Sequence, residues 1–343
     1  MDHLPMNDGE VKQLSQDLMM DDSLVDKLSG YSGFDVGKDL SGVDNVCDFQ
    51  RLSRRFLEIV LRKTSDGFTS SGIQDIDMSR GHLFVSNHRD IVLDPALLSL
   101  ELGRHKHETA FNIFGDNLAG GLAGHLLRAN RGYMLVRSGS GREKAGSFRD
   151  LSYFILDSIG LDHHVWIAQR DGRAKDGIDR TNPSLIKHLY SAHRAIPFDA
   201  FVSRLSIVPL AVSYEFDPCE MSKARELYLR DKHGSYEKSA TEDLKSILLG
   251  LTDYKGRIHL SFGTPLKGMF ETPRAVADEI DMQIRSGYLL FPSNHDAVRL
   301  KEDPQADVPL KRRISEYPAE LQPFILDMYA NPVYSKRRAD AAR

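Results

Sequence analysis

The sequence predicts an α/β fold in which a central sheet of about seven strands, mostly parallel or mixed, is flanked by helices and preceded by a helical appendage. Short apolar runs alternate with longer stretches in which apolar residues recur every three or four positions, as buried strands and their connecting helices do. Several of these runs end in polar or basic residues, which is typical of the sheet edge where α/β proteins bind ligands. A chain of 343 residues can also bury a large core.

The composition is that of a soluble globular protein, with 41% hydrophobic and 27% charged residues. No uncharged apolar stretch approaches the ~20 residues that span a bilayer, and the first residues lack the basic and then apolar pattern of a secretory signal. The two cysteines, Cys47 and Cys219, suit a reducing compartment and lack the spacing of a zinc site. We therefore expect a cytoplasmic protein, or one held peripherally on the cytoplasmic face of a membrane.

The net charge of −4 is unevenly distributed along the chain. Residues 1–50 hold eleven acidic and three basic side chains, a net of −8, so residues 51–343 carry a net of +4. A weakly basic body favours anionic substrates or a membrane surface, and its positive excess is too small to indicate nucleic-acid binding.

The chain is expected to divide into an acidic helical appendage at 1–65, an α/β domain at 66–300 and a C-terminal tail at 301–343 with a basic end. Short acidic helices and a glycine-rich linker at 30–33 are predicted first, followed by a helix over 43–63 whose apolar stripe packs on the body. The tail contains apolar side chains at 324–329, which either pack on the body or contact a membrane surface beside the basic end.

The elements of the α/β domain follow from hydrophobic periodicity. The predicted strands cover 73–78, 83–86, 109–114, 133–136, 165–168, 205–214 and 258–263. The predicted helices cover 94–102, 141–156, parts of 215–257, and 276–284, and the glycine-containing stretch 118–127 resembles a phosphate loop only superficially, since it lacks the lysine and hydroxyl residue of a P-loop. Pro209 lies inside the longest strand and indicates a bulge or an edge strand, because proline cannot donate to a sheet ladder.

A histidine and an acid follow the strand at 83–86. His88 comes directly after Asn87, and Asp94 opens the next helix with Pro95 at its first turn. A histidine beside a carboxylate can take a proton from a hydroxyl, because the carboxylate fixes the tautomer and stabilises the imidazolium. The alternative is a histidine in an ordinary polar turn. Asp90 is the alternative acid that could orient the ring.

Other predicted strands also end in polar or basic residues. Parallel strands would bring these ends to the edge that holds His88, and a cluster of cations there would suit a phosphate, since guanidinium groups bind phosphate oxygens in pairs. The alternative for a single arginine at a strand end is a surface ion pair. The cations are Arg137, Arg170, Arg173 and Lys175, and the nearby polar residues are Asp116 and Asn117.

Five blocks occur in order over roughly residues 75–270. They are Asn87-His88 with Asp94-Pro95, Gly132 to Arg137, Asp171-Gly172-Arg173-Ala174-Lys175, Ile207 to Tyr214 with its Val208-Pro209, and Ser261 to Pro265. Together these blocks resemble those of the glycerolipid acyltransferase superfamily, which includes glycerol-3-phosphate and 1-acyl-glycerol-3-phosphate acyltransferases. Two departures stand out. His88 and Asp94 are separated by five residues where the family has four, and Ala174 falls where the family has arginine.

The resemblance implies an acyltransferase that moves a fatty acyl group from a thioester to the hydroxyl of glycerol-3-phosphate, a lysophospholipid or a related acceptor. His88 would be the base and Asp94 would hold its ring. Acyl-CoA or acyl-carrier protein would be the co-substrate, with no bound cofactor and no metal. The cations named above would bind the acceptor phosphate, and the supporting residues of the blocks would be Asn87, Gly132, Asp171, Gly172 and Pro209.

Two other functions compete with acyl transfer. A metal-dependent phosphoester hydrolase could use the side chains of His88, Asp90, Asp94, Asp116 and Asn117, which are expected at neighbouring strand ends. A non-catalytic lipid-binding member of the fold would keep the architecture without the chemistry.

Overall fold

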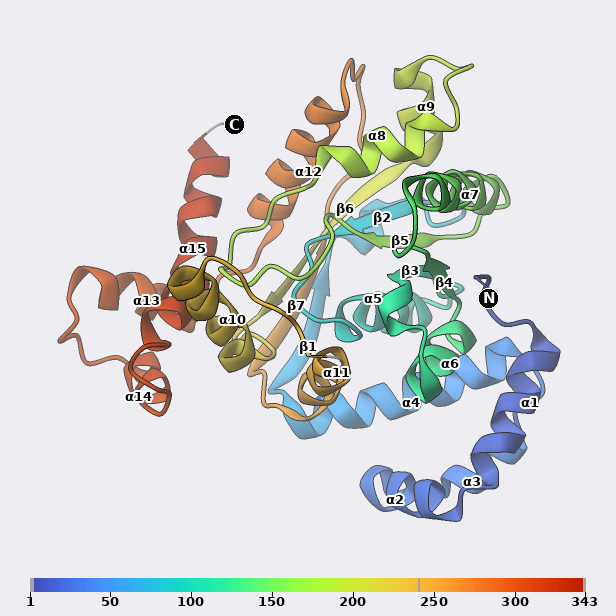
Figure 1. Ribbon diagram of the computed structural model, residues 1–343, viewed down its shortest axis with the longest axis horizontal. Helices are drawn as coiled ribbons and strands as arrows, with labels where there is room; N and C mark the ends of the chain where they lie inside the picture. The colour runs from blue at the N-terminus through green and yellow to red at the C-terminus, as the bar shows by residue number, and fades with distance from the viewer. Residues whose placement is uncertain (1–2, 240, 342–343) are drawn as a thin grey trace.

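A seven-stranded mixed sheet lies at the centre of the computed structural model, which describes residues 3–239 and 241–341 (Figure 1). The strand order is β1-β7-β6-β2-β5-β3-β4. From β6 to β4 neighbouring strands are parallel, whereas β7 is antiparallel to β6 and parallel to β1. The predicted fold class is confirmed. The strands are β1 (Gly67–Ser71), β2 (Leu83–Ser86), β3 (Phe111–Gly115), β4 (Gly132–Leu135), β5 (Val165–Ala168), β6 (Ile207–Tyr214) and β7 (Arg257–Phe262).

Helices cover both faces of the sheet (Figure 1). One face packs against α7 (Gly141–Gly160), α8 (Pro183–Ser191), α9 (Phe198–Leu205) and α12 (Pro273–Gly287). The other packs against α4 (Val46–Thr64) and α5 (Leu93–Arg104), with α6 (Gly121–Ala129) and α11 (Glu242–Thr252) alongside α4. The strand pattern alternates between these two cores because successive side chains of a strand point to opposite faces. Leu83 and Val85 join the first core, and Phe84 joins the second.

The strand predicted at 73–78 is wrong. The chain forms the edge strand β1 at Gly67–Ser71 and then a single 3₁₀ turn at Ile73–Asp75. Gly72 begins that turn with φ of 87°, a left-handed conformation that favours glycine. Ile73 and Ile76 are still buried, but they reach the core from a turn. Their apolar pair therefore gave a strand-like signal without a strand.

Pro209 lies in an interior strand, so the predicted bulge or edge is also wrong. The ladder between β6 and β7 begins one residue later, at Leu210 opposite Phe262. The carbonyl of Pro209 accepts a hydrogen bond from the N–H of Gly263, just beyond the end of β7. Because the N and C=O of a strand residue face the same neighbour, the missing N–H points to where β7 has ended and no ladder bond is lost.

The N-terminal helices are α1 (Asp8–Met19), α2 (Asp22–Ser32) and α3 (Val36–Ser41), followed by α4. The glycine-rich segment at 30–33 is the end of α2, capped by Gly33 in the left-handed conformation, and not a linker. The predicted helix over 43–63 corresponds to α4, whose residues Phe49, Ile59 and Val60 are buried. Figure 1 shows α4 running along the sheet's helical layer, with α1 to α3 beyond its N-terminal end.

The C-terminal helices form a further core with α10 (Glu220–His233). They are α13 (Pro292–Glu302), α14 (Pro309–Ser315) and α15 (Gln322–Ala341). The apolar side chains that could have packed on the body or contacted a membrane are packed on the body, with Ile325, Met328 and Tyr329 at 0–2% exposure.

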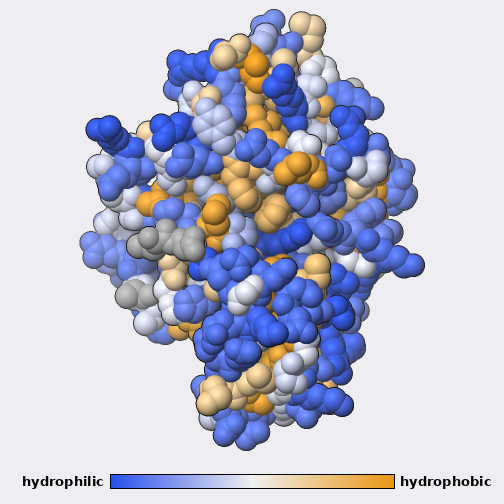
Figure 2. All heavy atoms as spheres, turned by 90° about the vertical axis from the view of Figure 1, so that its right-hand side faces the viewer, coloured by the Kyte–Doolittle hydropathy of each residue, from blue (hydrophilic) through white to orange (hydrophobic). Residues whose placement is uncertain are grey.

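The face seen in Figure 2, on the side of α1, α6 and α7, is largely hydrophilic, with hydrophobic side chains gathered mainly in its upper half. No helix of residues 3–239 and 241–341 is long and apolar enough to cross a membrane.

Two histidines stack at the opposite end of the sheet from His88. The rings of His82 and His164 lie 5.7 Å apart and nearly parallel, against Phe84. His82 has partners in Asp77 and Ser206, whereas Nδ1 of the buried His164 has no partner among the described residues. Burial lowers the pKa of His164 to about 4, and the nearby His82 adds to this effect.

This histidine makes stability depend on pH. The pKa of His164 is lower in the folded chain than its ordinary value of 6.5, so the unfolded chain binds the extra proton first. The associated stability is complete above pH 6.5 and is lost as the pH falls toward 4, by about 3 kcal/mol at most. We expect His164→Phe to flatten urea-unfolding free energies between pH 6.5 and 4. The control is His295→Phe at an exposed position, and equal pH dependence in both variants would contradict the assignment.

Candidate active site

The carboxyl ends of β2, β3, β4 and β5 meet around one pocket of about 480 Å³. The parallel arrangement of these strands brings the predicted residues to one sheet edge. We call this space the His88 pocket. Its polar lining comprises His88, Asp116, Asn117, Arg137, Ser138, Arg170, Asp171, Arg173, Lys175, Lys238 and Asp243.

His88 is held by Asp94. The distance between His88 Nδ1 and Asp94 Oδ2 is 2.9 Å, and the imidazole is 14% exposed while the carboxylate is fully buried. Because an ionised carboxylate only accepts hydrogen bonds, Nδ1 carries the hydrogen and Nε2 is left with its lone pair. The ring also packs edge-on against Trp166. His88 is therefore oriented as a base whose free nitrogen can serve the pocket.

Asp94 also organises the turn that carries His88. Its Oδ2 accepts the backbone N–H groups of Arg89 and Asp90, at 2.7 and 2.9 Å, and its Oδ1 accepts the Tyr214 hydroxyl at 2.8 Å. These hydrogen bonds close the turn over the five residues that separate His88 from Asp94. The carboxylate therefore holds the imidazole and the backbone of the turn together.

Asp90 does not orient the His88 ring, which was the alternative to Asp94. Its Oδ1 accepts the N–H groups of Val92 and Leu93 and so stabilises the turn that leads into α5. Burial raises the pKa of Asp90, and the neighbouring Asp94 carboxylate raises it further. Asp94, and not Asp90, contacts the His88 ring.

Asn87 extends the pairing of β2 past the end of the strand. Its side-chain oxygen accepts the Val212 N–H at 2.7 Å, and its amide donates to the Val212 carbonyl at 3.0 Å. On the other side, the N–H of Ala174 donates to the His88 carbonyl at 2.8 Å. The backbone of His88 is thus tied to β6 through its neighbour and to the loop after β5 directly.

Arg137 lies at the wall of the pocket. Its guanidinium forms an ion pair with the exposed Asp171. It also lies so close to Gly115 that a Cβ there would be 2.5 Å from Arg137 Nη2. Burial lowers the pKa of Arg137, against the opposing effect of Asp116. The pairing with Asp171 is the alternative that was open for this residue, and it coexists with a position on the pocket wall.

The other three cations differ in how strongly they are already engaged. Arg173 is 8% exposed and donates to Ser246 at 3.0 Å, while its Nη1 has no partner among the described residues. Lys175 pairs with the buried Glu226 at 3.0 Å, and burial lowers the pKa of Lys175. Arg170 is exposed. An added anion therefore has the easiest access to Arg170 and Arg137.

The supporting glycines have local structural reasons. A Cβ on Gly132 would lie 2.0 Å from Phe114 Cε1 and 2.5 Å from the Leu127 carbonyl oxygen, so any other residue would displace the Phe114 ring and the end of α6. Gly172 adopts φ of 72° in the loop after β5. Pro209 lies in β6, the strand next to β2, and it does not line the pocket.

Sequence reasoning missed a second space that adjoins the His88 pocket. It is a cavity of about 190 Å³ between α4 and α5, which we call the α4–α5 cavity. Ile91, Ile113, Phe114 and Trp166 line both spaces, so the two are adjacent. Its walls are mostly apolar. The only related signal in the sequence was the apolar stripe of α4. Such a stripe predicts which face of a helix is packed, and it does not reveal a gap in that packing. Lys238 and Asp243, near and within α11, were also missed.

The predicted site residues do not form a metal site. The carboxylates of Asp94 and Asp90 accept the hydrogen bonds described above, and Asp116 accepts hydrogen bonds from the backbone N–H and the hydroxyl of Ser138. Across residues 3–239 and 241–341, no group of three His, Cys, Asp or Glu side chains is placed to hold a metal ion.

A buried ion cluster lies behind the His88 turn. Arg89 is 1% exposed and pairs with Asp179 at 2.7 Å and with Asp217 at 3.4 Å. Lys223 pairs with Asp217 and donates to the Arg89 carbonyl at 2.7 Å. Removing one member of such a cluster leaves a buried charge without compensation, which costs more than losing a surface pair.

We therefore expect Arg89→Met to lower the free energy of unfolding by about 3–5 kcal/mol. The matched control is Arg257→Met, which removes an ion pair with Glu215 at a half-exposed side chain and should cost at most about 1 kcal/mol. Urea denaturation of both variants measures the difference. A similar decrease in the free energy of unfolding in both variants would show that the buried cluster stabilises the fold no more than a surface ion pair does.

Comparison with known proteins gives a limited result. No family model matches the chain, and no curated protein matches it. Among solved structures, the chain is similar to the 1-acyl-sn-glycerophosphate (LPA) acyltransferase PlsC from Thermotoga maritima. The identity is 12% and the TM-score 0.41, over 81% of this chain and 93% of that chain. At so low a similarity, the function has to be argued from the site itself.

Proposed function

We propose that the protein is an acyltransferase that moves a fatty acyl group from a thioester to the hydroxyl of a phosphorylated acceptor, such as glycerol-3-phosphate or a lysophospholipid. The observation that carries the proposal is the buried Asp94 carboxylate 2.9 Å from His88 Nδ1, at a pocket that has cationic side chains in its lining and adjoins a mostly apolar cavity. Acyl-CoA or acyl-carrier protein is the proposed donor.

The proposed reaction is a direct transfer. Nε2 of His88 takes the proton of the acceptor hydroxyl as its oxygen attacks the thioester carbonyl, and Asp94 stabilises the resulting imidazolium. When the tetrahedral intermediate collapses, the carbon–sulfur bond breaks and the imidazolium returns the proton to the departing thiolate. The step needs no nucleophile from the protein, and neither cysteine lines the His88 pocket. Cys47 is exposed, and Cys219 is buried, with its pKa raised by burial to about 11.

The charges of the pocket support a phosphorylated acceptor. Arg137 and Arg170 line it, and guanidinium groups bind phosphate oxygens with paired hydrogen bonds. Arg137 gives up only an exposed carboxylate partner to do so, since the side chain of Asp171 is 73% exposed. The apolar α4–α5 cavity supports the other half of the reaction, because it offers a fatty chain a place away from water next to the base.

Loss of the base should abolish most of the activity. We expect His88→Ala and Asp94→Asn each to lower kcat by about 10²–10⁴-fold, since a positioned general base contributes that much. A screen with labelled acyl-CoA and acyl-carrier protein against glycerol-3-phosphate, lysophospholipids and other hydroxyl or amine acceptors measures this. His295→Ala is the matched control, because Asn294-His295 repeats the Asn-His pair at an exposed histidine. No transfer to any acceptor by the parent protein would refute the proposal.

The phosphate contact has its own test. We expect Arg137→Met to raise KM for a phosphorylated acceptor by about tenfold or more, because each charge-assisted hydrogen bond lost is worth about 1.5–3 kcal/mol. Steady-state kinetics with a phosphorylated acceptor and its unphosphorylated counterpart separates the effects, since only the first should respond. Arg180→Met, at an exposed position, is the control. An equal change for both acceptors would show that Arg137 does not bind the phosphate.

A further inference from the structure

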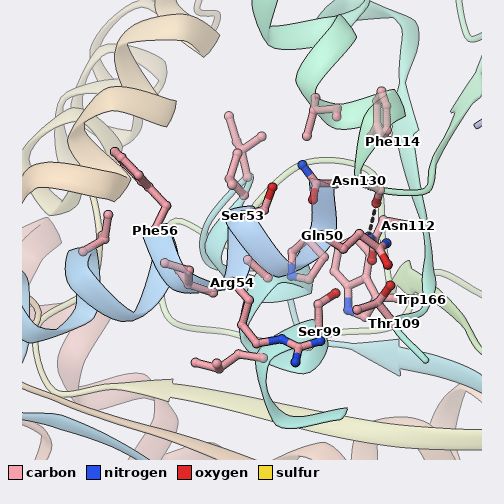
Figure 3. A pocket seen from close by; sticks show the side chains of 18 of the residues that line it. Gln50, Ser53, Arg54, Phe56, Ser99, Thr109, Asn112, Phe114, Asn130 and Trp166 are labelled. Atoms are coloured by element: carbon pink, nitrogen blue, oxygen red, sulfur yellow. Dashed lines mark hydrogen bonds between the residues drawn. The ribbon is translucent and has the colours of Figure 1, made fainter. Parts of the chain in front are cut away.

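The α4–α5 cavity is not lined by apolar groups alone. Figure 3 shows Gln50, Ser53 and Arg54 on α4 reaching the same space as Ser99 on α5 and Thr109 and Asn112 near the start of β3. Polar side chains are costly in the wall of a cavity that holds only a hydrocarbon chain, because those without a protein partner lose hydration and gain no hydrogen bond.

Three buried polar atoms of this wall have no hydrogen-bond partner among the described residues: Arg54 Nε, Thr109 Oγ1 and Asn112 Oδ1. Thr109 is 6% exposed. The Gln50 side chain, which is 9% exposed and lines the same cavity, makes no hydrogen bond within residues 3–239 and 241–341. Buried polar groups are almost always satisfied, so unsatisfied ones that line a cavity point to a ligand that satisfies them.

Arg54 adds a charge to the same wall. Its guanidinium lies against Gly103 of α5, where a Cβ would be 2.1 Å from Arg54 Cζ, and its Nε has no partner. No carboxylate of the described residues pairs with it. Arg54 is only partly buried, so its charge lies at the wall of the cavity rather than inside the packed core. A ligand oxygen in the cavity would give its guanidinium a partner.

We propose that the α4–α5 cavity binds a fatty acyl chain that carries an oxygen function along it or at its far end, and that Arg54 and Gln50 donate hydrogen bonds to that oxygen. This proposal rests on the proposed function, and it narrows the substrate class to hydroxylated, oxo or terminally carboxylated chains. Ile91, Ile113, Phe114 and Trp166 hold the apolar part of the chain near His88, since they line both spaces.

The test compares methyl decanoate, a methyl hydroxydecanoate and monomethyl decanedioate as competitors of a fluorescent acyl probe bound to the full chain. We expect the parent protein to bind at least one oxygen-bearing ester about tenfold more tightly than methyl decanoate, and Arg54→Met and Gln50→Leu to bring this ratio close to one. The ester that binds most tightly shows whether a hydroxyl or a carboxyl group is recognised. The matched control is Arg55→Met, since Arg55 is exposed and pairs with Asp39.

Equal or weaker binding of both oxygen-bearing esters by the parent protein would overturn the inference, as would a ratio that is unchanged in both variants. Gln50→Leu keeps the test decisive where Arg54→Met fails to fold. Binding in the His88→Ala protein separates this inference from the proposed function. Selective binding without any acyl transfer by the parent would refute the transfer alone, and transfer of all three chains with equal kcat/KM would refute the chain selectivity alone.

Discussion

The site depends on one buried carboxylate, that of Asp94. It accepts four hydrogen bonds: from the His88 imidazole, from the backbone N–H groups of Arg89 and Asp90, and from the Tyr214 hydroxyl. A buried carboxylate is stable only where its oxygens are satisfied in this way. The bonds that satisfy the Asp94 oxygens therefore also fix the turn, tie it to β6 through Tyr214, and set the direction of the imidazole. Orientation of the base and stability of the turn cannot be separated.

The ion cluster behind that turn explains why the C-terminal helices belong to the body. Asp217 pairs with Arg89, and its backbone N–H donates to the Tyr329 hydroxyl of α15 at 3.0 Å. Tyr329 in turn contacts Glu220 at the start of α10. A chain of polar contacts thus runs from the residue after His88 to the last helix. Because each member is buried, the loss of any one leaves another without a partner, which couples the helical core to the geometry of the sheet edge.

Much of the sheet and its edge could be predicted, because both depend on local patterns. Buried strands such as Leu83–Ser86 show as short apolar runs, and parallel strands place the residues that follow them at one edge, so His88 and Arg137 could be expected there. Contacts between distant segments have no such signal. Lys175 and Arg137 look alike in the sequence, yet Glu226 of α10 holds Lys175, and only the fold brings these residues together. The choice between Asp94 and Asp90 had the same difficulty, since it depends on how the backbone folds within one turn.

The α4–α5 cavity could not be predicted for a further reason. A gap between packed helices arises from side chains that fail to fill the space, and hydrophobic periodicity reports which face is buried without reporting how completely. Its position still matters for the chemistry. In the proposed reaction, the thioester donor has an apolar chain and a polar carrier, and the phosphorylated acceptor is anionic, so the two proposed substrates would need opposite surroundings on either side of His88. Ile91, Ile113, Phe114 and Trp166 stand at the boundary between these surroundings. With the cations on one side of this boundary and the apolar walls on the other, His88 lies where a hydroxyl and a thioester carbonyl could meet.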